Sequence, residues 1–140
     1  MKRYQDFAVL LLRLALSAGF ISAVSSRLGL WGNYSSGWEN FLAYAEKVNS
    51  FAPKSFIPAI AVTTTITETL LALLLLIGFK TRLSAIATSL LTLLFAFAMT
   101  YSFGLKDPLD YSVFVFSMAA FSLSTAEQYK WSLDEIISKK

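Results

Sequence analysis

Four long apolar segments dominate the chain, and short polar stretches separate them. The segments cover residues 7–26, 57–79, 83–103 and 109–125. An α-helix rises 1.5 Å per residue, so about 20 apolar residues cross the ~30 Å hydrocarbon layer of a bilayer. The first three segments reach that length, and the fourth, with 17 residues, lies at the lower limit. The pattern predicts an all-α integral membrane protein, in which residues 1–140 form one domain, a four-helix bundle.

The stretches between the apolar segments predict further local structure. Gly78 can end the second helix and Thr81 can cap the third, which makes a tight helical hairpin. In the long first connection, apolar residues recur at helical spacing: Trp38, Phe41, Leu42, Ala45 and Val48. They predict a short amphipathic helix that lies on the membrane surface or covers the bundle. In the tail, residues 126–140, Ser132 and Glu135 have the spacing of a capping box and predict a short helix outside the bilayer.

The composition agrees with a lipid environment and excludes several kinds of chemistry. Hydrophobic residues make up 56% of the chain and charged residues only 15%, whereas soluble domains carry about 25% charged residues. There is no Cys and no His, so the chain itself cannot form disulfides, thiolate zinc sites or His-ligated haem. We expect no metal site. The net charge of +3 is small and the basic residues form no stripe, so nothing indicates nucleic-acid binding.

Basic residues are distributed unequally between the two predicted sides of the membrane. Four spans place both termini and the hairpin turn on one side. That side carries seven basic residues, Lys2, Arg3, Lys80, Arg82, Lys130, Lys139 and Lys140, against four on the other, Arg27, Lys47, Lys54 and Lys106. Because cytoplasmic loops are enriched in Lys and Arg, we expect both termini in the cytoplasm.

Two charged residues, Arg13 and Glu68, lie inside predicted spans. Each costs about 2.5–3.5 kcal/mol at the bilayer centre, so a partner is expected. Arg13 lies ~15 Å along its helix from Arg3, and Glu68 lies ~18 Å before Lys80. These similar depths predict an Arg13–Glu68 ion pair, either a structural clasp or the lining of a ligand cavity or proton path. Arg13 alone could instead extend its side chain to the headgroups.

Small and hydroxyl residues share one helical face with Glu68. The face includes Ala61, Thr64 and Thr65. Such residues let helices pack closely and form hydrogen bonds between helices, and packing alone explains the pattern. The alternative is a polar cavity around Glu68. The candidate ligand-binding or structural polar centre therefore consists of Arg13, Thr64, Thr65 and Glu68.

Three motifs, taken in their order and spacing, resemble a known family. The first predicted span contains LLRLAL (11–16), the second continues as ETLLALLLLIGFKTR (68–82), and the tail contains YKWSLD (129–134). These are similar to the LLRL opening, the acidic residue with its leucine run and G-x-x-T-R turn, and the G-R-Y-S-L-D terminus of the DoxX family. The chain departs from the family pattern at Ser17, where Gly is frequent, and at residues 126–128, where the family is Gly-rich.

The resemblance implies a small four-helix protein of a bacterial or archaeal cytoplasmic membrane. For some members it implies a role in membrane redox complexes that oxidise thiosulfate with quinone as acceptor, and for others a role in oxidative-stress complexes. We therefore expect a non-catalytic subunit of a quinone-linked redox complex, with quinone as the candidate cofactor. The expected partners are the lipid bilayer and either a redox protein or a second copy of the chain.

Two other functions remain open at this point. A small permease or channel would use the same polar centre as a substrate or proton site. An assembly or anchoring protein would instead use the aromatic first connection as a docking surface. Because Cys and His are absent, an independent redox enzyme is not expected.

Overall fold

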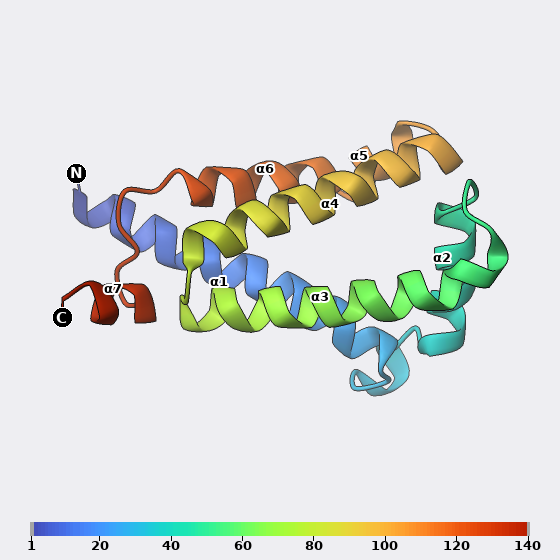
Figure 1. Cartoon of the computed structure of the whole chain (residues 1–140), viewed down its shortest axis with the longest axis horizontal. Coiled ribbons are helices and arrows are strands. Elements are labelled where there is room, and N and C mark those ends of the chain that lie inside the picture. The colour runs from blue at the N-terminus through green and yellow to red at the C-terminus, as the bar shows by residue number, and fades with distance from the viewer. Residues whose placement is uncertain (1, 140) are drawn as a thin grey trace.

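The computed structural model describes residues 2–139, which fold into helices joined by short connections (Figure 1). In chain order these are α1 (Lys2–Arg27), η1 (Gly32–Tyr34), α2 (Trp38–Val48), η2 (Lys54–Phe56), α3 (Ile57–Ile77), α4 (Thr81–Phe103), α5 (Lys106–Asp110), α6 (Val113–Ser124) and α7 (Leu133–Ser138). Helix α1 packs on α3, and α4 packs on α6. Both chain ends lie at one end of the bundle, and α2 lies across the other. We call these the terminal end and the capped end.

Apolar side chains cover the outside of the long helices, and hydroxyl side chains are buried between them. Leu83 and Leu94 of α4 are 62% and 64% exposed, whereas the buried face of that helix consists of Thr81, Ser84, Ala85, Thr88, Ser89, Thr92, Ala96 and Met99. Soluble proteins favour the opposite distribution. Among the described residues, three helices are long and apolar enough to cross a membrane: Arg3–Arg27, Lys54–Ile77 and Thr81–Phe103. The helical architecture agrees with the prediction from the sequence.

The predicted fourth span, residues 109–125, is not one continuous helix. Helix α5 ends at Asp110, Ser112 adopts a left-handed backbone with φ 56°, and α6 begins at Val113. The 12 residues of α6 extend ~18 Å, less than the hydrocarbon layer. The prediction of a single helix is therefore wrong. Hydropathy did not reveal the break, because Tyr111 and Ser112 leave the helical backbone within an otherwise apolar run.

The C-terminal tail holds the turn between α3 and α4. Gly78 ends α3 in the left-handed conformation, with φ 69°, as predicted. The side chain of Thr81 does not cap α4. Instead, the backbone N–H groups of Lys80 and Thr81 donate to the two carboxylate oxygens of Asp134, each at 2.7 Å. A carboxylate is favourable there because a helix N-terminus carries partial positive charge.

The tail itself is ordered by the predicted cap. The Ser132 hydroxyl accepts a hydrogen bond from the Glu135 backbone N–H at 3.1 Å, and α7 begins directly after it. The Glu135 carboxylate accepts from the Trp131 backbone N–H at 2.8 Å. In a complete capping box it would accept from Ser132, so half of the predicted box is present.

The predicted amphipathic helix is confirmed as α2. Its packing position follows from the displacement of α1 along the bundle axis relative to α3. Arg13 lies level with Gly78, because a Cβ placed on Gly78 would come within 2.6 Å of the Arg13 guanidinium. From that level, α1 continues for 14 residues, or ~21 Å, to Arg27, whereas α3 extends back 21 residues, or ~31 Å, to Ile57. Helix α1 therefore stops ~10 Å short of the start of α3. Helix α2 packs on α3 and α4 in the space that remains.

Candidate ligand-binding site

Glu68 forms an ion pair with Arg27, the last residue of α1. Two guanidinium nitrogens of Arg27 face the two Glu68 carboxylate oxygens, and the Nη2–Oε1 distance is 3.2 Å. The Glu68 side chain is only 3% exposed and the Arg27 side chain 12%. Two parallel hydrogen bonds between a guanidinium and a carboxylate form the strongest common type of ion pair and fix its geometry. Each charge thus offsets the cost of burying the other.

A threonine and a phenylalanine complete the surroundings of the Arg27 guanidinium. Its Nη1 donates to the Thr65 hydroxyl at 3.3 Å, and that hydroxyl donates to the Ala61 carbonyl at 2.8 Å. On the other side, the ring of Phe41 lies 4.0 Å from the Arg27 Cζ atom. A cation over an aromatic face is attracted by the ring's quadrupole. Because Phe41 belongs to α2, this contact connects the helix at the capped end to the buried charge pair.

A cavity of about 610 Å³ lies beside this pair, between α2, α3 and α4. Its walls are mostly apolar, and most of the α4 side chains that line it are Leu, Phe, Ala or Met. A few polar residues also line it, namely Arg27, Tyr44, Asn49, Thr64 and Tyr101. Small-molecule sites in proteins are typically ~300–1,000 Å³ and combine apolar walls with a few polar groups. The cavity fits that description.

The predicted Arg13–Glu68 ion pair is wrong. Arg13 is 2% exposed and lies at the terminal end, where its Nη2 donates to the Trp131 carbonyl at 2.8 Å. Glu68 lies ten residues before Gly78 along α3, so ~15 Å separates the two side chains along the bundle. The depth estimate failed because it placed Arg3 level with Lys80. In the structure, the residues before Arg13 extend ~15 Å past the α3–α4 turn.

The other three predicted site residues lie together. Glu68 and Thr65 both bind Arg27, and Thr64 lines the cavity one residue away. The residue that sequence analysis missed is Arg27, which was assigned to the external connection because it follows the first apolar segment. The sequence holds no local signal for this contact, because it depends on the level of α1 relative to the α3–α4 turn. With Arg13 at the level of Gly78, Arg27 lies ~6 Å from the level of Glu68, within reach of an arginine side chain.

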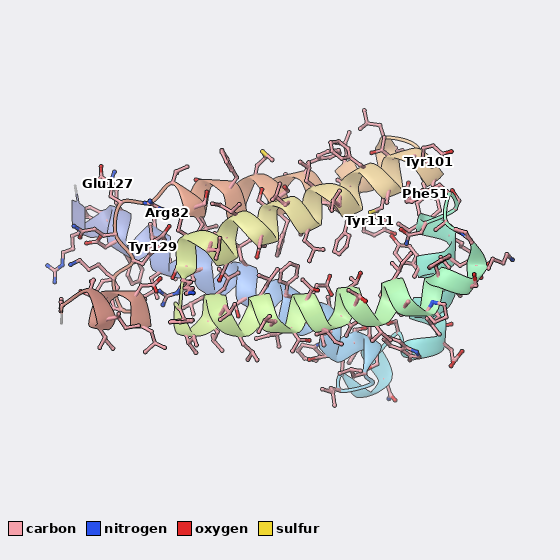
Figure 2. All side chains as sticks on the ribbon, in the orientation of Figure 1. Phe51, Arg82, Tyr101, Tyr111, Glu127 and Tyr129 are labelled. Atoms are coloured by element: carbon pink, nitrogen blue, oxygen red, sulfur yellow. The ribbon has the colours of Figure 1, made fainter. Side chains whose placement is uncertain are left out.

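The buried Arg13 side chain packs at the turn between α3 and α4. It lies against the last turn of α3, where a cation is favourable because the helix C-terminus carries partial negative charge. Its Nε and Nη1 atoms are buried and have no hydrogen-bond partner among residues 2–139. Figure 2 shows other polar side chains at this end, including Arg82, Glu127 and Tyr129. The Nη2 atom of Arg82 donates to the Ala126 carbonyl at 3.1 Å and helps to hold the tail.

These features define a class, namely small helical membrane proteins whose long helices bury polar groups and expose apolar ones. The sequence profile of the DoxX family matches residues 8–101, about two-thirds of the chain. The chain therefore belongs to the DoxX family, as the motifs at 11–16 and 68–82 indicated. No curated protein and no solved structure gives a significant match.

Proposed function

We propose that this DoxX family protein binds a lipid-soluble quinone in the cavity beside Arg27 and Glu68. In this role it is a non-catalytic subunit of a membrane redox complex, and electrons reach the quinone from a partner protein. The observation that carries the proposal is the position of a bidentate, buried ion pair next to an apolar cavity of about 610 Å³. An apolar ring with carbonyl oxygens suits such a cavity, because the apolar walls can contact the ring and the polar groups can donate hydrogen bonds to the carbonyl oxygens.

Four polar residues at or beside the cavity have roles in this proposal. The Arg27 guanidinium has five N–H donors, of which Glu68 and Thr65 use only some. A remaining donor, or the Thr64 hydroxyl, can bind a quinone carbonyl. Glu68 holds the guanidinium in place, and Phe41 adds an aromatic face next to it. Glu68 and Thr65 are thus positioning residues, and Arg27 and Thr64 are the proposed ligand contacts.

We further infer a prokaryotic cytoplasmic membrane location, four membrane crossings and cytoplasmic termini. Helices α5 and α6 follow one another along α4 and together cover residues 106–124, ~28 Å of helical rise, which supports a fourth crossing with a break at Ser112. The terminal end carries more basic residues than the capped end, which supports placing the terminal end on the cytoplasmic side of the membrane. The capped end then faces outward.

We favour ligand binding over transport because of what fills the bundle between the cavity and the terminal end. Leu16, Leu75, Ala85, Ala120 and Leu123 form a buried apolar cluster there. A substrate or ion path through the membrane needs polar groups or water along its length. The buried hydroxyls of Ser17, Ser84 and Ser117 in this region already donate to backbone carbonyls, and the apolar cluster packs beside them.

The test is quinone binding by the purified protein in lipid nanodiscs. We expect saturable binding of a quinone analogue by the wild type and about tenfold weaker binding by Glu68→Gln and Thr64→Val, a loss of ~1.4 kcal/mol. The matched control is Thr63→Val, because Thr63 is exposed and is not among the residues that line the cavity, so this variant should bind like wild type. Absence of saturable binding by the wild type, or equal binding by all four proteins, would contradict the proposal.

A further inference from the structure

The cavity has two boundaries through which a ligand could pass. One is the cover formed by α2 and the segment that follows it, at the water-facing surface of the capped end. The other is the gap between α3 and α4, at the side of the bundle. We propose that the ligand enters sideways from the lipid, between α3 and α4, while the cover stays closed. This inference rests on the proposed quinone site and adds the route to it.

The cover is fastened to the end of α4 by hydrogen bonds. The Ser102 hydroxyl donates to the Val48 carbonyl at 2.6 Å, and the Ser50 hydroxyl lies 2.8 Å from the Ser102 oxygen. Because Ser102 uses its proton for Val48, Ser50 is the donor in the second bond. The two bonds join the C-terminal end of α2 to the last turn of α4.

Aromatic contacts also join the cover to the end of α4. The ring centroids of Phe51 and Tyr101 lie 5.6 Å apart in an edge-to-face arrangement, and those of Tyr44 and Phe103 lie 6.2 Å apart. Figure 2 shows Phe51 and Tyr101 next to each other at the capped end. An edge-to-face contact such as that of Phe51 with Tyr101 is favourable beyond the area it buries. Together with Phe41 on Arg27, these contacts hold the cover along its length.

Among residues 2–139, no comparable hydrogen bonds or aromatic contacts join α3 to α4 at the level of the cavity. The two helices meet at the turn after Gly78 and diverge towards the capped end (Figure 1). Residues that line the cavity there are themselves exposed. On α4, Leu94 and Phe97 are 64% and 56% exposed, and on α3, Ile60 and Thr64 are half-buried. Exposed apolar residues on a spanning helix face lipid, so this opening faces the hydrocarbon layer.

The position of the opening along α4 also favours a lipid-soluble ligand with a polar head and an apolar tail. Leu94 and Phe97 lie 13 and 16 residues after Thr81, so the opening is in the leaflet nearest the capped end. A quinone ring that enters there meets the Arg27 guanidinium at the inner end of the cavity. Its isoprenoid tail can stay in the opening and continue into the lipid, so the whole molecule does not have to fit the 610 Å³ cavity.

The test uses a reversible crosslink across the cover. The chain has no Cys, and the Ser50 and Ser102 oxygens already lie 2.8 Å apart, so Ser50→Cys with Ser102→Cys should form a disulfide on oxidation. In nanodiscs we expect the oxidised and reduced forms to bind a quinone analogue with association rates within about twofold of each other. The reduced form of the same molecules shows that the variant is folded. Loss of binding on oxidation, restored by reductant, would overturn lateral entry and assign the cover as the route.

A second variant tests the lateral opening directly. Ala98 lines the cavity on α4, and Ala98→Phe should slow association at least fivefold. Leu90→Phe is the control, because Leu90 is 58% exposed on the same helix and is not among the residues that line the cavity. Equal association rates for Ala98→Phe and Leu90→Phe would overturn lateral entry. Absence of binding by the wild type would instead remove the quinone site itself, so the two failures are distinguishable.

Discussion

Arg27 and Glu68 meet across α1 and α3 with two guanidinium nitrogens on two carboxylate oxygens, and the Glu68 side chain is 3% exposed. Their meeting depends on the shift of α1, which ends ~10 Å before α3 begins. The same shift leaves the space that α2 covers and in which the cavity lies. One feature of helix register therefore produces both the charge pair and the cavity.

The contributions of Arg27 and Glu68 to the free energy of unfolding should be coupled. Removal of one partner leaves a buried, unpaired charge, which costs about 3–5 kcal/mol in known cases. Arg27→Leu and Glu68→Leu should each lower the free energy of unfolding in detergent, and the double variant should lose clearly less than the sum. The comparison pair is Arg13→Leu with Glu68→Leu, whose losses should add because the residues lie ~15 Å apart. Additive losses for the first pair, or coupling in the second, would contradict the structure.

Gly78 should tolerate no side chain. A Cβ there would lie 2.4 Å from the Ser132 Cβ and 2.6 Å from the Arg13 Nη1, and the residue has φ 69°. Gly78→Ala should therefore cost more than the ~1–2 kcal/mol of left-handed backbone strain. Gly29→Ala measures that strain alone, since Gly29 has φ 78° and no atom within 4 Å of its Cβ position. Thermal unfolding of both variants measures the two losses of stability. Equal losses for Gly78→Ala and Gly29→Ala would show that Arg13 and the tail do not pack on the turn.

The tail should loosen in acid. Hydrogen bonds from Lys139 and from the Trp131 backbone lower the pKa of Glu135 from 4.5 to about 2. Because the pKa in the folded state is lowered, the ionised carboxylate stabilises the tail fully above pH ~4.5, and this stabilisation is lost as the pH falls towards 2. A spin label at Ile136→Cys, which is 60% exposed, should gain mobility over that range. In a Glu135→Gln background, the label should already be mobile at pH 7 and should not change; a persistent transition would assign the effect to another group.

The arrangement of both bundle ends in the membrane can be tested with single cysteines. Tyr34 is 91% exposed at the capped end, Lys106 follows α4, and Glu127 follows α6. With cytoplasmic termini and four crossings, an impermeant thiol reagent added to intact cells should label Tyr34→Cys and Lys106→Cys but not Glu127→Cys. Labelling of Glu127→Cys alone would reverse the orientation. Labelling of all three would mean that α5 and α6 do not cross.

The three long helices, the end of α3 at Gly78 and helix α2 follow from the sequence, because each depends on local apolar pattern and glycine chemistry. The partner of Glu68 does not. Hydropathy shows where a helix is apolar, but it does not show how far α1 extends past the turn, and that length decides whether Arg13 or Arg27 reaches Glu68. Likewise, Thr81 looked like a cap, whereas the carboxylate that caps α4 belongs to Asp134, 53 residues away. Contacts that depend on tertiary packing leave no local signal.

Covalent mapping can show whether the cavity beside Arg27 and Glu68 holds a quinone. A quinone that carries a photoreactive group on its ring is bound to the wild-type protein in nanodiscs, irradiated, and located by mass spectrometry of peptides. We expect labelling of residues 41–48 of α2 and 91–101 of α4, suppressed by excess unlabelled quinone and reduced in Glu68→Gln. Labelling confined to the terminal end, or labelling that excess quinone does not suppress, would contradict this expectation.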